Sequence, residues 1–451
     1  MALTDRISSI EKTWHIMIKQ QEFAKRRDHL MEIAGDGSVI IVRAATQKIR
    51  NNDAHYPYRQ DSDFLYLSGF AEPDAMMVLL PQDKGGQSIM FCRARDRTRE
   101  MWDGAMAGTG GATEQFGFDQ AYPIAEMEQR LPALMHGRER VYYDLGRDLE
   151  FDQLLIGWLN DFRSKTRKKF LAPDEITALD HNLHEMRLFK SRTEISAMRR
   201  AARVAIDAHK SAMQVCKPGM NEADIHAQLL HSFTRQQCEA SYIPIVGGGT
   251  NACVLHYNAN RDELNDGEML LIDAGAEYDG YASDITRTFP VNGKFSGPQR
   301  DLYEVVLAAQ LAAIEDVRSG NPWDHVHETA VHVATQGMLD LGILRGSLEE
   351  ALEEEHFRDY YVHNTGHWLG LDVHDVGEYE IDGHSRVLEP GMVLTVEPGI
   401  YIPPSATAVD EIWRGMGIRI EDNVAVTKDT ADVLTADLCK NMDDIEAMMA
   451  A

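Results

Sequence analysis

Four acidic residues lie in or near strongly apolar runs, where a charged side chain is costly unless something neutralises it. The runs are MLLID, VLTVE and IRIED, and the acids are Asp273, Asp284, Glu397 and Glu421. A hairpin that turns near Asp279-Gly280 would place Asp273 and Asp284 opposite each other on paired strands. Like charges at that distance repel unless they share a proton or a cation. The pattern therefore predicts a cation site made of carboxylates.

The acids also belong to two related segments of the chain. LNDGEMLLIDAG and LEPGMVLTVEPG share glycine, leucine and acid positions at one constant offset, so that Asp273 matches Glu397. At a different offset, the motif G-x-x-x-D ending at Asp284 matches G-x-x-x-E ending at Glu421. Each half thus runs through a turn, an apolar strand, an acid, a glycine and a second acid. This echo predicts a pseudo-twofold internal repeat in which each half delivers two carboxylates.

A histidine-rich segment could supply a nitrogen ligand to the same site. YYVHNTGHWLGLDVHDVGEYE contains His363, His367 and His374. The first two are spaced as in a helical zinc motif, but Gly366 and Gly370 argue against a helix there. On a strand or a glycine-rich loop, one histidine can be a ligand while the others face a substrate. Carboxylates with one imidazole suit a hard divalent ion such as Mn²⁺, with Zn²⁺ or Co²⁺ as alternatives.

The elements that must position these groups indicate two domains of α/β (α+β) class. Residues 1–33 read as a helix, and short apolar runs at 38–45, 64–70, 75–81 and 88–94 predict strands. Helical stretches around 126–136 and 150–163 alternate with VYYDLG. We therefore expect a mixed α/β domain over residues 1–173, with the basic stretch at 163–170 as a plausible linker.

The second expected domain covers residues 174–451. It begins helix-rich, with KPGM breaking the helical pattern and Asn221 as a candidate cap for the next helix. Strands and loops follow, then a helical block over roughly 298–358, then further strands to 427. The acidic and histidine motifs all fall on the strand and loop segments of this domain.

Composition narrows the class of protein. The 451 residues include 72 Asp and Glu against 45 Lys and Arg, a formal net charge of −27 that disfavours nucleic-acid binding. The five cysteines form no C-x-x-C motif, which fits a reducing compartment better than a disulfide framework. Neither a secretory signal nor an apolar run of about 18 residues is visible, so we expect no membrane span and a cytoplasmic location.

These motifs resemble those of the pita-bread-fold metallopeptidases, and among them the aminopeptidase P (Xaa-Pro aminopeptidase) family. In the second domain the resemblance rests on LLIDAGAEYDGYASDITRTFPV, HWLGLDVHDVG, TVEPGIY and GIRIEDNVAVT. In the first domain it rests on YPYRQDSDFLYLSGFAEPDA. The resemblance extends over nearly the whole chain. It implies an N-terminal aminopeptidase P-like domain before a creatinase- or methionine aminopeptidase-like catalytic domain.

The resemblance also implies a dinuclear metal site, usually of manganese. Asp284 and Glu421 would bridge both ions, Asp273 would complete one ion, and His367 with Glu397 would complete the other. Five more positions match substrate-binding or catalytic residues of the family: His256, His363, His374, Tyr401 and Arg419. Trp102 resembles a tryptophan that a neighbouring subunit contributes in tetrameric relatives, so a homodimer or homotetramer is expected. One departure is Asn364, which replaces the usual glycine after the first histidine of the H-G-x-x-H pattern.

The implied activity is hydrolysis of the bond between an N-terminal residue and a following proline in Xaa-Pro-Yaa peptides. A hydroxide bridging the two ions would attack the carbonyl, and Glu397 would take its proton. His256 and His374 would stabilise the developing oxyanion or the backbone on the proline side. His363, Tyr401 and Arg419 would shape the proline pocket.

Three alternatives share the fold. Prolidase, the Xaa-Pro dipeptidase, has the same ligands, although the YPYRQDSDF segment favours aminopeptidase P. Creatinase-like C–N hydrolases lack the metal carboxylates that are present here. A non-catalytic peptide-binding module usually loses ligands, and all five are intact in this sequence.

Overall fold

The computed structural model describes residues 17–82, 86–164 and 171–451, and it divides the chain into two compact units, 1–186 and 187–451. The boundary expected from the sequence lies earlier, after residue 173. The difference arises because β8 (Glu175–Thr177) pairs with β7 (Arg140–Tyr142), which makes it the last strand of the first unit's sheet. Most of the expected linker, residues 165–170, lies outside the described residues.

The N-terminal unit is built on a six-stranded mixed sheet of order β6-β5-β4-β1-β7-β8. Its central strand β1 pairs antiparallel with β4 and parallel with β7. Two helices, α5 and α6, bury Leu131, Met135, Phe151 and Leu155 against one face of this sheet. The bounds of elements in this unit are α1 (Gln20–Ala34), β1 (Ser38–Arg43), β2 (Ile49–Asn51), β3 (Ala54–His55), α2 (Ser62–Ser68), β4 (Met76–Leu80), β5 (Gln87–Cys92), α3 (Arg97–Asp103), α4 (Gly108–Glu114), β6 (Gln120–Pro123), α5 (Met127–Met135) and α6 (Leu149–Ser164).

One strand expected in this unit is wrong, because residues 64–70 belong largely to helix α2 (Ser62–Ser68). The side chain of Asp61 accepts a hydrogen bond from the backbone N–H of Phe64 and so caps the helix start. Gly69 ends the helix in the left-handed conformation, with φ of 64°. These two caps outweigh the apolar run that suggested a strand.

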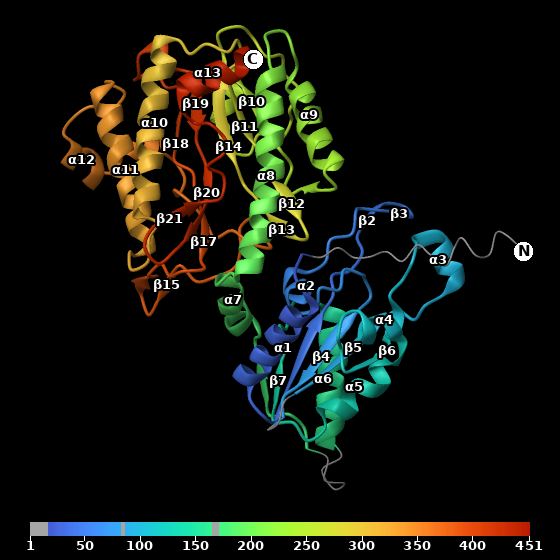
Figure 1. Ribbon diagram of the computed structural model, residues 1–451. Helices are drawn as coiled ribbons and strands as arrows, with labels where there is room; N and C mark the ends of the chain where they lie inside the picture. Colours follow the sequence, from blue (N-terminus) through green and yellow to red (C-terminus); the bar gives the residue numbers. More distant parts are fainter. Residues whose placement is uncertain (1–16, 83–85, 165–170) are drawn as a thin grey trace, which may run out of the picture. The chain divides into compact units, whose positions relative to one another are not determined.

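Helices cover the C-terminal unit on two sides. Figure 1 shows α8 and α9 on one side of its strands and α10 and α11 on the other, and residues from all four helices share one apolar core. Capping boxes begin α8 at Ser191, α9 at Asn221 and α10 at Ser296, so the cap expected at Asn221 is confirmed. The helices are α7 (Asp180–Leu188), which crosses the boundary, α8 (Arg192–Val215), α9 (Glu222–Arg235), α10 (Gly297–Asp316), α11 (Trp323–Asp340), α12 (Leu348–Glu353) and α13 (Met442–Ala450).

Between the helices lie two sets of strands, one from each half of the unit. The first half forms the ladder β10-β11-β14 and the small sheet β13-β12-β9, and the second half forms β17-β20-β21 and β18-β19. The bounds are β9 (Glu239–Ala240), β10 (Ile245–Gly248), β11 (Met269–Asp273), β12 (Ala276–Tyr278), β13 (Tyr281–Ala282), β14 (Thr286–Pro290), β15 (Glu380–Ile381), β16 (His384–Ser385), β17 (Val393–Val396), β18 (Gly399–Ile402), β19 (Met416–Arg419), β20 (Asp422–Val426) and β21 (Ala431–Val433). The mixed α/β class and the internal repeat both agree with the sequence patterns.

The predicted hairpin turns at Asp279 and Gly280, which both have positive φ. Its register pairs Asp273 with Thr286, and the same register continues through the hairpin, which leaves Asp284 opposite Gly275. Asp273 and Asp284 are therefore diagonal neighbours on one face of the ladder, rather than directly opposite as expected. Gly275 is required here because a Cβ would lie 1.7 Å from the carbonyl oxygen of Ser283.

The second half places its acids face to face. β17 pairs with β20 and β18 pairs with β19 in one continuous register, with Val396 opposite Asp422 and Gly399 opposite Arg419. That register puts Glu397 opposite Glu421. The two strand pairs thus bring all four acids to the middle of the unit.

A buried ion cluster secures the loop that follows His367. The carboxylate of Asp375 lies 2.6 Å from Nη2 of Arg187 and 2.9 Å from Nζ of Lys190, and these three side chains are almost fully buried. Arg187 also reaches Asp372, whose side chain is 40% exposed. Burial alone would raise the pKa of Asp375, but Lys190 and Arg187 outweigh it and lower the pKa below its usual 3.8. The cluster should therefore stabilise the fold.

We predict that Asp375→Asn lowers the free energy of unfolding at pH 7 by about 3–5 kcal/mol, because the buried Lys190 loses its counter-ion and the buried Arg187 loses its buried carboxylate partner. The pKa of Asp375 is lower in the folded than in the unfolded protein, so its stabilisation is complete above the unfolded value and is lost as the pH falls through the folded value. Urea unfolding should show a constant gap between wild type and variant from pH 7 to about 5, narrowing below about 4. Asp372→Asn is the control, with an expected loss under about 1 kcal/mol. A gap that persists unchanged at pH 3 would contradict the account.

Candidate metal centre

The strand registers and the histidine loop bring all five expected ligands into one cluster. Atoms of Asp284, His367 and Glu421 lie within 4.8 Å of one another. Nε2 of His367 is 3.4 Å from Oδ2 of Asp284 and 3.5 Å from Oε1 of Glu397. Asp273 joins the cluster through a tyrosine, because the hydroxyl of Tyr242 is hydrogen-bonded to both Asp273 and Asp284. Two strand pairs and one loop therefore meet at a single site.

The imidazole of His367 is oriented as a ligand requires. Its Nδ1 lies 2.9 Å from the carbonyl oxygen of Trp368, which fixes the N–H on that nitrogen and directs Nε2 at the carboxylates. Burial would lower the pKa of His367, but Asp284 and Glu397 raise it to about 9. The cluster therefore attracts positive charge strongly at this nitrogen.

The carboxylates carry more negative charge than the surrounding side chains neutralise. Burial, followed by the charges of neighbouring acids, raises the pKa of Glu421 well above its usual value. Burial also raises the pKa of Glu397 to about 7, against the opposing effects of His367 and Arg419. Four carboxylates and one imidazole form the donor set that hard divalent ions prefer. The residues present thus fit the metal that the motifs imply.

Polar side chains behind the cluster hold the acids in place. Oγ1 of Thr286 donates to Glu421 at 2.7 Å and accepts from Nε of Arg419 at 3.0 Å. Asn423 is hydrogen-bonded to the backbone N–H and carbonyl of Asp284. Arg419 also donates to Asp273 at 2.6 Å. These contacts tie the two halves of the repeat together at the site.

Sequence reasoning missed Tyr242, Thr286 and Asn423. Thr286 had a signal, because the hairpin register places it opposite Asp273. Asn423 lies on β20, two positions after Glu421, and also could have been suspected. Tyr242 lies between β9 and β10 in a segment with no motif, and only the fold brings its hydroxyl to the acids.

The residues expected to face the substrate divide into a buried group and an exposed group. Tyr401 is buried, and its hydroxyl lies 2.8 Å from Nε2 of His363 and accepts from Nη1 of Arg419 at 2.8 Å. His374 is exposed, with its ring centroid 4.3 Å from that of His367. His256 is also exposed, and its neighbours Leu255 and Tyr257 pack on the apolar cluster that contains Tyr401. All five therefore lie around the carboxylate cluster.

Two positions flagged in the sequence have simple outcomes. Asn364 has an ordinary backbone conformation without positive φ, so the departure from glycine causes no strain. Trp102 lies on α3 of the N-terminal unit with its side chain 86% exposed.

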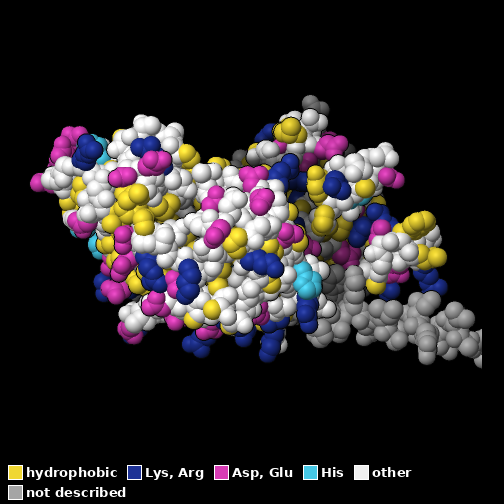
Figure 2. Space-filling view, turned by 90° about the horizontal axis from the view of Figure 1, so that it is seen from above, with side chains coloured by type: hydrophobic (Ala, Val, Ile, Leu, Met, Phe, Trp, Pro, Cys, Tyr) yellow, Lys and Arg dark blue, Asp and Glu magenta, His cyan; other side chains and the backbone are white. Residues whose placement is uncertain are grey.

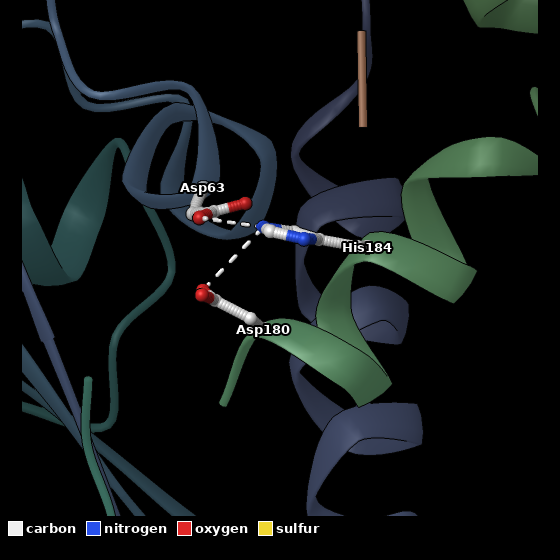
Figure 3. A group of neighbouring side chains, drawn as sticks. All are labelled: Asp63, Asp180 and His184. Carbon is white, nitrogen blue, oxygen red and sulfur yellow. Dashed lines mark ion pairs between the residues drawn. The ribbon is translucent and has the colours of Figure 1, made fainter. Parts of the chain in front are cut away.

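A second group of potential ligands lies in the N-terminal unit. Figure 3 shows His184 directed between Asp63 and Asp180, with its Nε2 at 3.6 Å and 3.5 Å from their carboxylates. Arg147 already pairs with both acids, at 3.5 Å from Asp63 and 2.6 Å from Asp180. This guanidinium supplies the positive charge that a metal ion would bring, so the group is an ion-paired cluster.

The face seen in Figure 2 shows no single acidic patch, because acidic and basic side chains are interspersed on it.

Within the described part of the chain, no helix combines the length and the apolar character needed to cross a bilayer.

The chain matches two known domain families. Residues 196–428 match metallopeptidase family M24, and residues 23–142 match the aminopeptidase P N-terminal domain. The chain is 44% identical over 436 residues to an Xaa-Pro aminopeptidase of Escherichia coli (strain K12), covering 96% of this chain and 98% of that protein. It is 42% identical over 441 residues to an Xaa-Pro aminopeptidase of Haemophilus influenzae, covering 98% of this chain and 100% of that protein.

Solved structures agree with the sequence relatives. Aminopeptidase PepP of Pseudomonas aeruginosa superposes with a TM-score of 0.94 at 49% identity, covering 96% of this chain and 98% of that chain. A zinc-substituted aminopeptidase P of E. coli in complex with product gives a TM-score of 0.93 at 44% identity, with the same coverage of both chains. The resemblance and the pita-bread fold inferred from the motifs are thereby confirmed. The chain belongs to metallopeptidase family M24 and, within it, to the aminopeptidase P enzymes, which are metal-dependent hydrolases.

Proposed function

We propose that this enzyme removes the N-terminal residue from Xaa-Pro-Yaa peptides at a site that holds two divalent ions, with Mn²⁺ as the physiological metal. The observation that carries the proposal is that four carboxylates and His367 lie in one cluster. Burial and the charges of neighbouring acids raise the pKa of Glu421, so the cluster would be stabilised by added positive charge. The relatives named as Xaa-Pro aminopeptidases support the substrate class. The zinc-substituted relative supports Zn²⁺ as an alternative occupant.

The ligand roles are those that the resemblance to the family implies. Asp284 and Glu421 would bridge the ions, with Asp273 completing one coordination sphere and His367 with Glu397 the other. When bound, the two ions supply a hydroxide nucleophile and polarise the scissile carbonyl. Glu397 accepts the proton of the attacking water on its carboxylate, and Oγ1 of Thr395, at 3.3 Å from Oε1, keeps that carboxylate in place.

The remaining residues would orient the peptide. His256 and His374 are exposed at the cluster and can donate hydrogen bonds to the oxyanion or to the backbone on the proline side. The hydrogen-bonded series His363, Tyr401 and Arg419 forms a rigid wall that suits the compact proline ring. Arg419 also neutralises part of the charge of Asp273.

Location and assembly are part of the same proposal. The five cysteines are unpaired, which suits a reducing compartment such as the cytoplasm. The exposed indole of Trp102 would contribute to the substrate site of a neighbouring subunit in a homodimer or homotetramer.

The decisive experiment on metal binding is Asp284→Ala. We expect loss of bound metal and of release of the N-terminal residue from Xaa-Pro-Yaa peptides, because a bridging carboxylate serves both ions. Mass spectrometry of the metal content and a peptide assay measure both effects. Asp266→Ala, which removes an exposed acid in the same half of the repeat, is the control and should retain both. Near-normal metal content and activity in Asp284→Ala would overturn the proposed mechanism.

Tyr242→Phe tests the support of the first-half carboxylates. Burial and the neighbouring acids raise the pKa of Tyr242, so its hydroxyl stays protonated and donates to Asp273 or Asp284. We expect metal affinity or activity to fall by about 10–100-fold, as for other groups that orient metal ligands. Tyr303→Phe is the matched control. It removes a buried hydroxyl that donates a hydrogen bond to the backbone carbonyl of Lys440, and it should leave metal affinity unchanged. If Tyr242→Phe matched Tyr303→Phe in both metal affinity and activity, Tyr242 would have no role in supporting the carboxylates.

Substrate length separates the proposed activity from that of prolidase. The match to the aminopeptidase P N-terminal domain favours tripeptides and longer peptides. After metal removal and readdition of Mn²⁺, Co²⁺ or Zn²⁺ in turn, we expect the highest kcat/KM with Mn²⁺ on an Xaa-Pro-Yaa tripeptide. Activity confined to the Xaa-Pro dipeptide would instead identify a prolidase.

A further inference from the structure

Glu222 is a fully buried carboxylate in the first turn of α9, away from the metal cluster. It accepts five hydrogen bonds of 2.8–2.9 Å, and the donors all come from one stretch of chain. Oε1 accepts from the backbone N–H of Gly248 and the side chain of Asn251, and Oε2 accepts from the hydroxyl of Tyr257. The backbone N–H groups of Arg261 and Asp262 complete the set.

The stretch held in this way, residues 248–262, is the loop that carries His256. The loop leaves β10, passes through a short helical turn at Gly249–Cys253, and returns beside the start of α9. Asn251 and Tyr257, on either side of His256, both donate to Glu222. The loop is therefore fastened from inside, while His256 remains exposed on its outer side.

A second buried side chain fastens the base of the same loop. Asn260 is buried, accepts from the backbone N–H of Val246 at 2.9 Å and donates to the carbonyl of Pro244 at 2.7 Å. These bonds join the loop to β10, the strand that pairs with the Asp273 strand β11. The position of the loop is thus fixed relative to the strand pair that carries Asp273.

A buried carboxylate needs its hydrogen bonds, because an unsatisfied charge in the protein interior is strongly unfavourable. Each donor on the loop can satisfy Glu222 only in the observed loop conformation. Moving the loop would therefore leave several acceptor sites of a buried charge unmet. The carboxylate makes this loop conformation much more favourable than its alternatives.

We infer that Glu222 is a positioning residue of the aminopeptidase reaction, acting through His256 by holding the loop of residues 248–262. The inference rests on the proposed function, in which His256 is a donor to the peptide. Leu255 and Tyr257, the neighbours of His256, pack on the apolar cluster that contains Tyr401, so the loop determines where His256 lies beside the other substrate-facing residues. None of the five hydrogen bonds to Glu222 comes from a residue of the carboxylate cluster.

A double-mutant cycle with Glu222→Gln and His256→Ala tests this. Glutamine has the same shape as glutamate, but its NH₂ group would face loop N–H groups that now donate to Glu222. Because two donors cannot form a hydrogen bond with each other, the loop should shift. We expect Glu222→Gln alone to lower kcat/KM by up to about 100-fold, with metal content unchanged. In the His256→Ala background the same substitution should change kcat/KM by less than about twofold, because the group it positions is gone.

Glu194→Gln is the matched control, since Glu194 is also a buried carboxylate in the first turn of a helix but accepts from Tyr281 and Ser191 instead. It should lower stability without any coupling to His256. Tyr257→Phe removes a single donor to Glu222 and should show a smaller loss in the same cycle. This milder variant keeps the test sharp should Glu222→Gln fold poorly.

Hydrogen exchange gives a readout independent of catalysis. Exchange over residues 248–262 should be faster in Glu222→Gln, but not in Glu194→Gln. Equal losses of kcat/KM in both backgrounds, or unchanged exchange in the loop, would overturn the inference. Full activity of His256→Ala would refute the proposed role of His256 instead, and the two failures are therefore distinguishable.

Discussion

The mutual repulsion of four closely placed carboxylates is the constraint on which the rest of this structure depends. Two strand pairs bring Asp273, Asp284, Glu397 and Glu421 together. Because these carboxylates are buried, their negative charges are unfavourable unless a cation neutralises them. Around them the protein provides one imidazole, one guanidinium and a set of hydroxyl and amide groups. The site is consequently arranged for an ion, and its supporting groups keep the acids from moving apart.

The supporting groups show how the repeat works as one unit. Thr286 and Arg419 connect acids of the first half with acids of the second, and Tyr242 joins the two acids of the first half. Arg287, fully buried behind Glu421, donates to the carbonyl of that residue and to Asp422. Removing any of these groups would leave a buried carboxyl or carbonyl group with fewer hydrogen-bond partners, so the same contacts support both the site and the core.

Sequence patterns found the four acids that meet in the cluster, because each acid lies in or beside an apolar strand, and an unfavourable placement of that kind is visible in a single chain. They predicted the hairpin at Asp279-Gly280 but not its exact partners, since one turn residue more or less shifts every pair. They assigned residues 64–70 to a strand because the apolar run was given more weight than the caps at Asp61 and Gly69. Tyr242 and Glu222 could not be found, because their roles come from contacts between segments with no shared motif.

The measurement that tests the central claim most directly is a calorimetric titration of the metal-free enzyme with Mn²⁺ at pH 7, repeated in buffers of different ionisation enthalpy. The pKa values of His367, about 9, and Glu397, about 7, mean that the metal-free cluster holds protons near neutral pH, and these must leave when the cations bind. The account predicts two ions bound per chain with release of protons to the buffer. Binding of fewer than two ions, or binding without proton release, would contradict it.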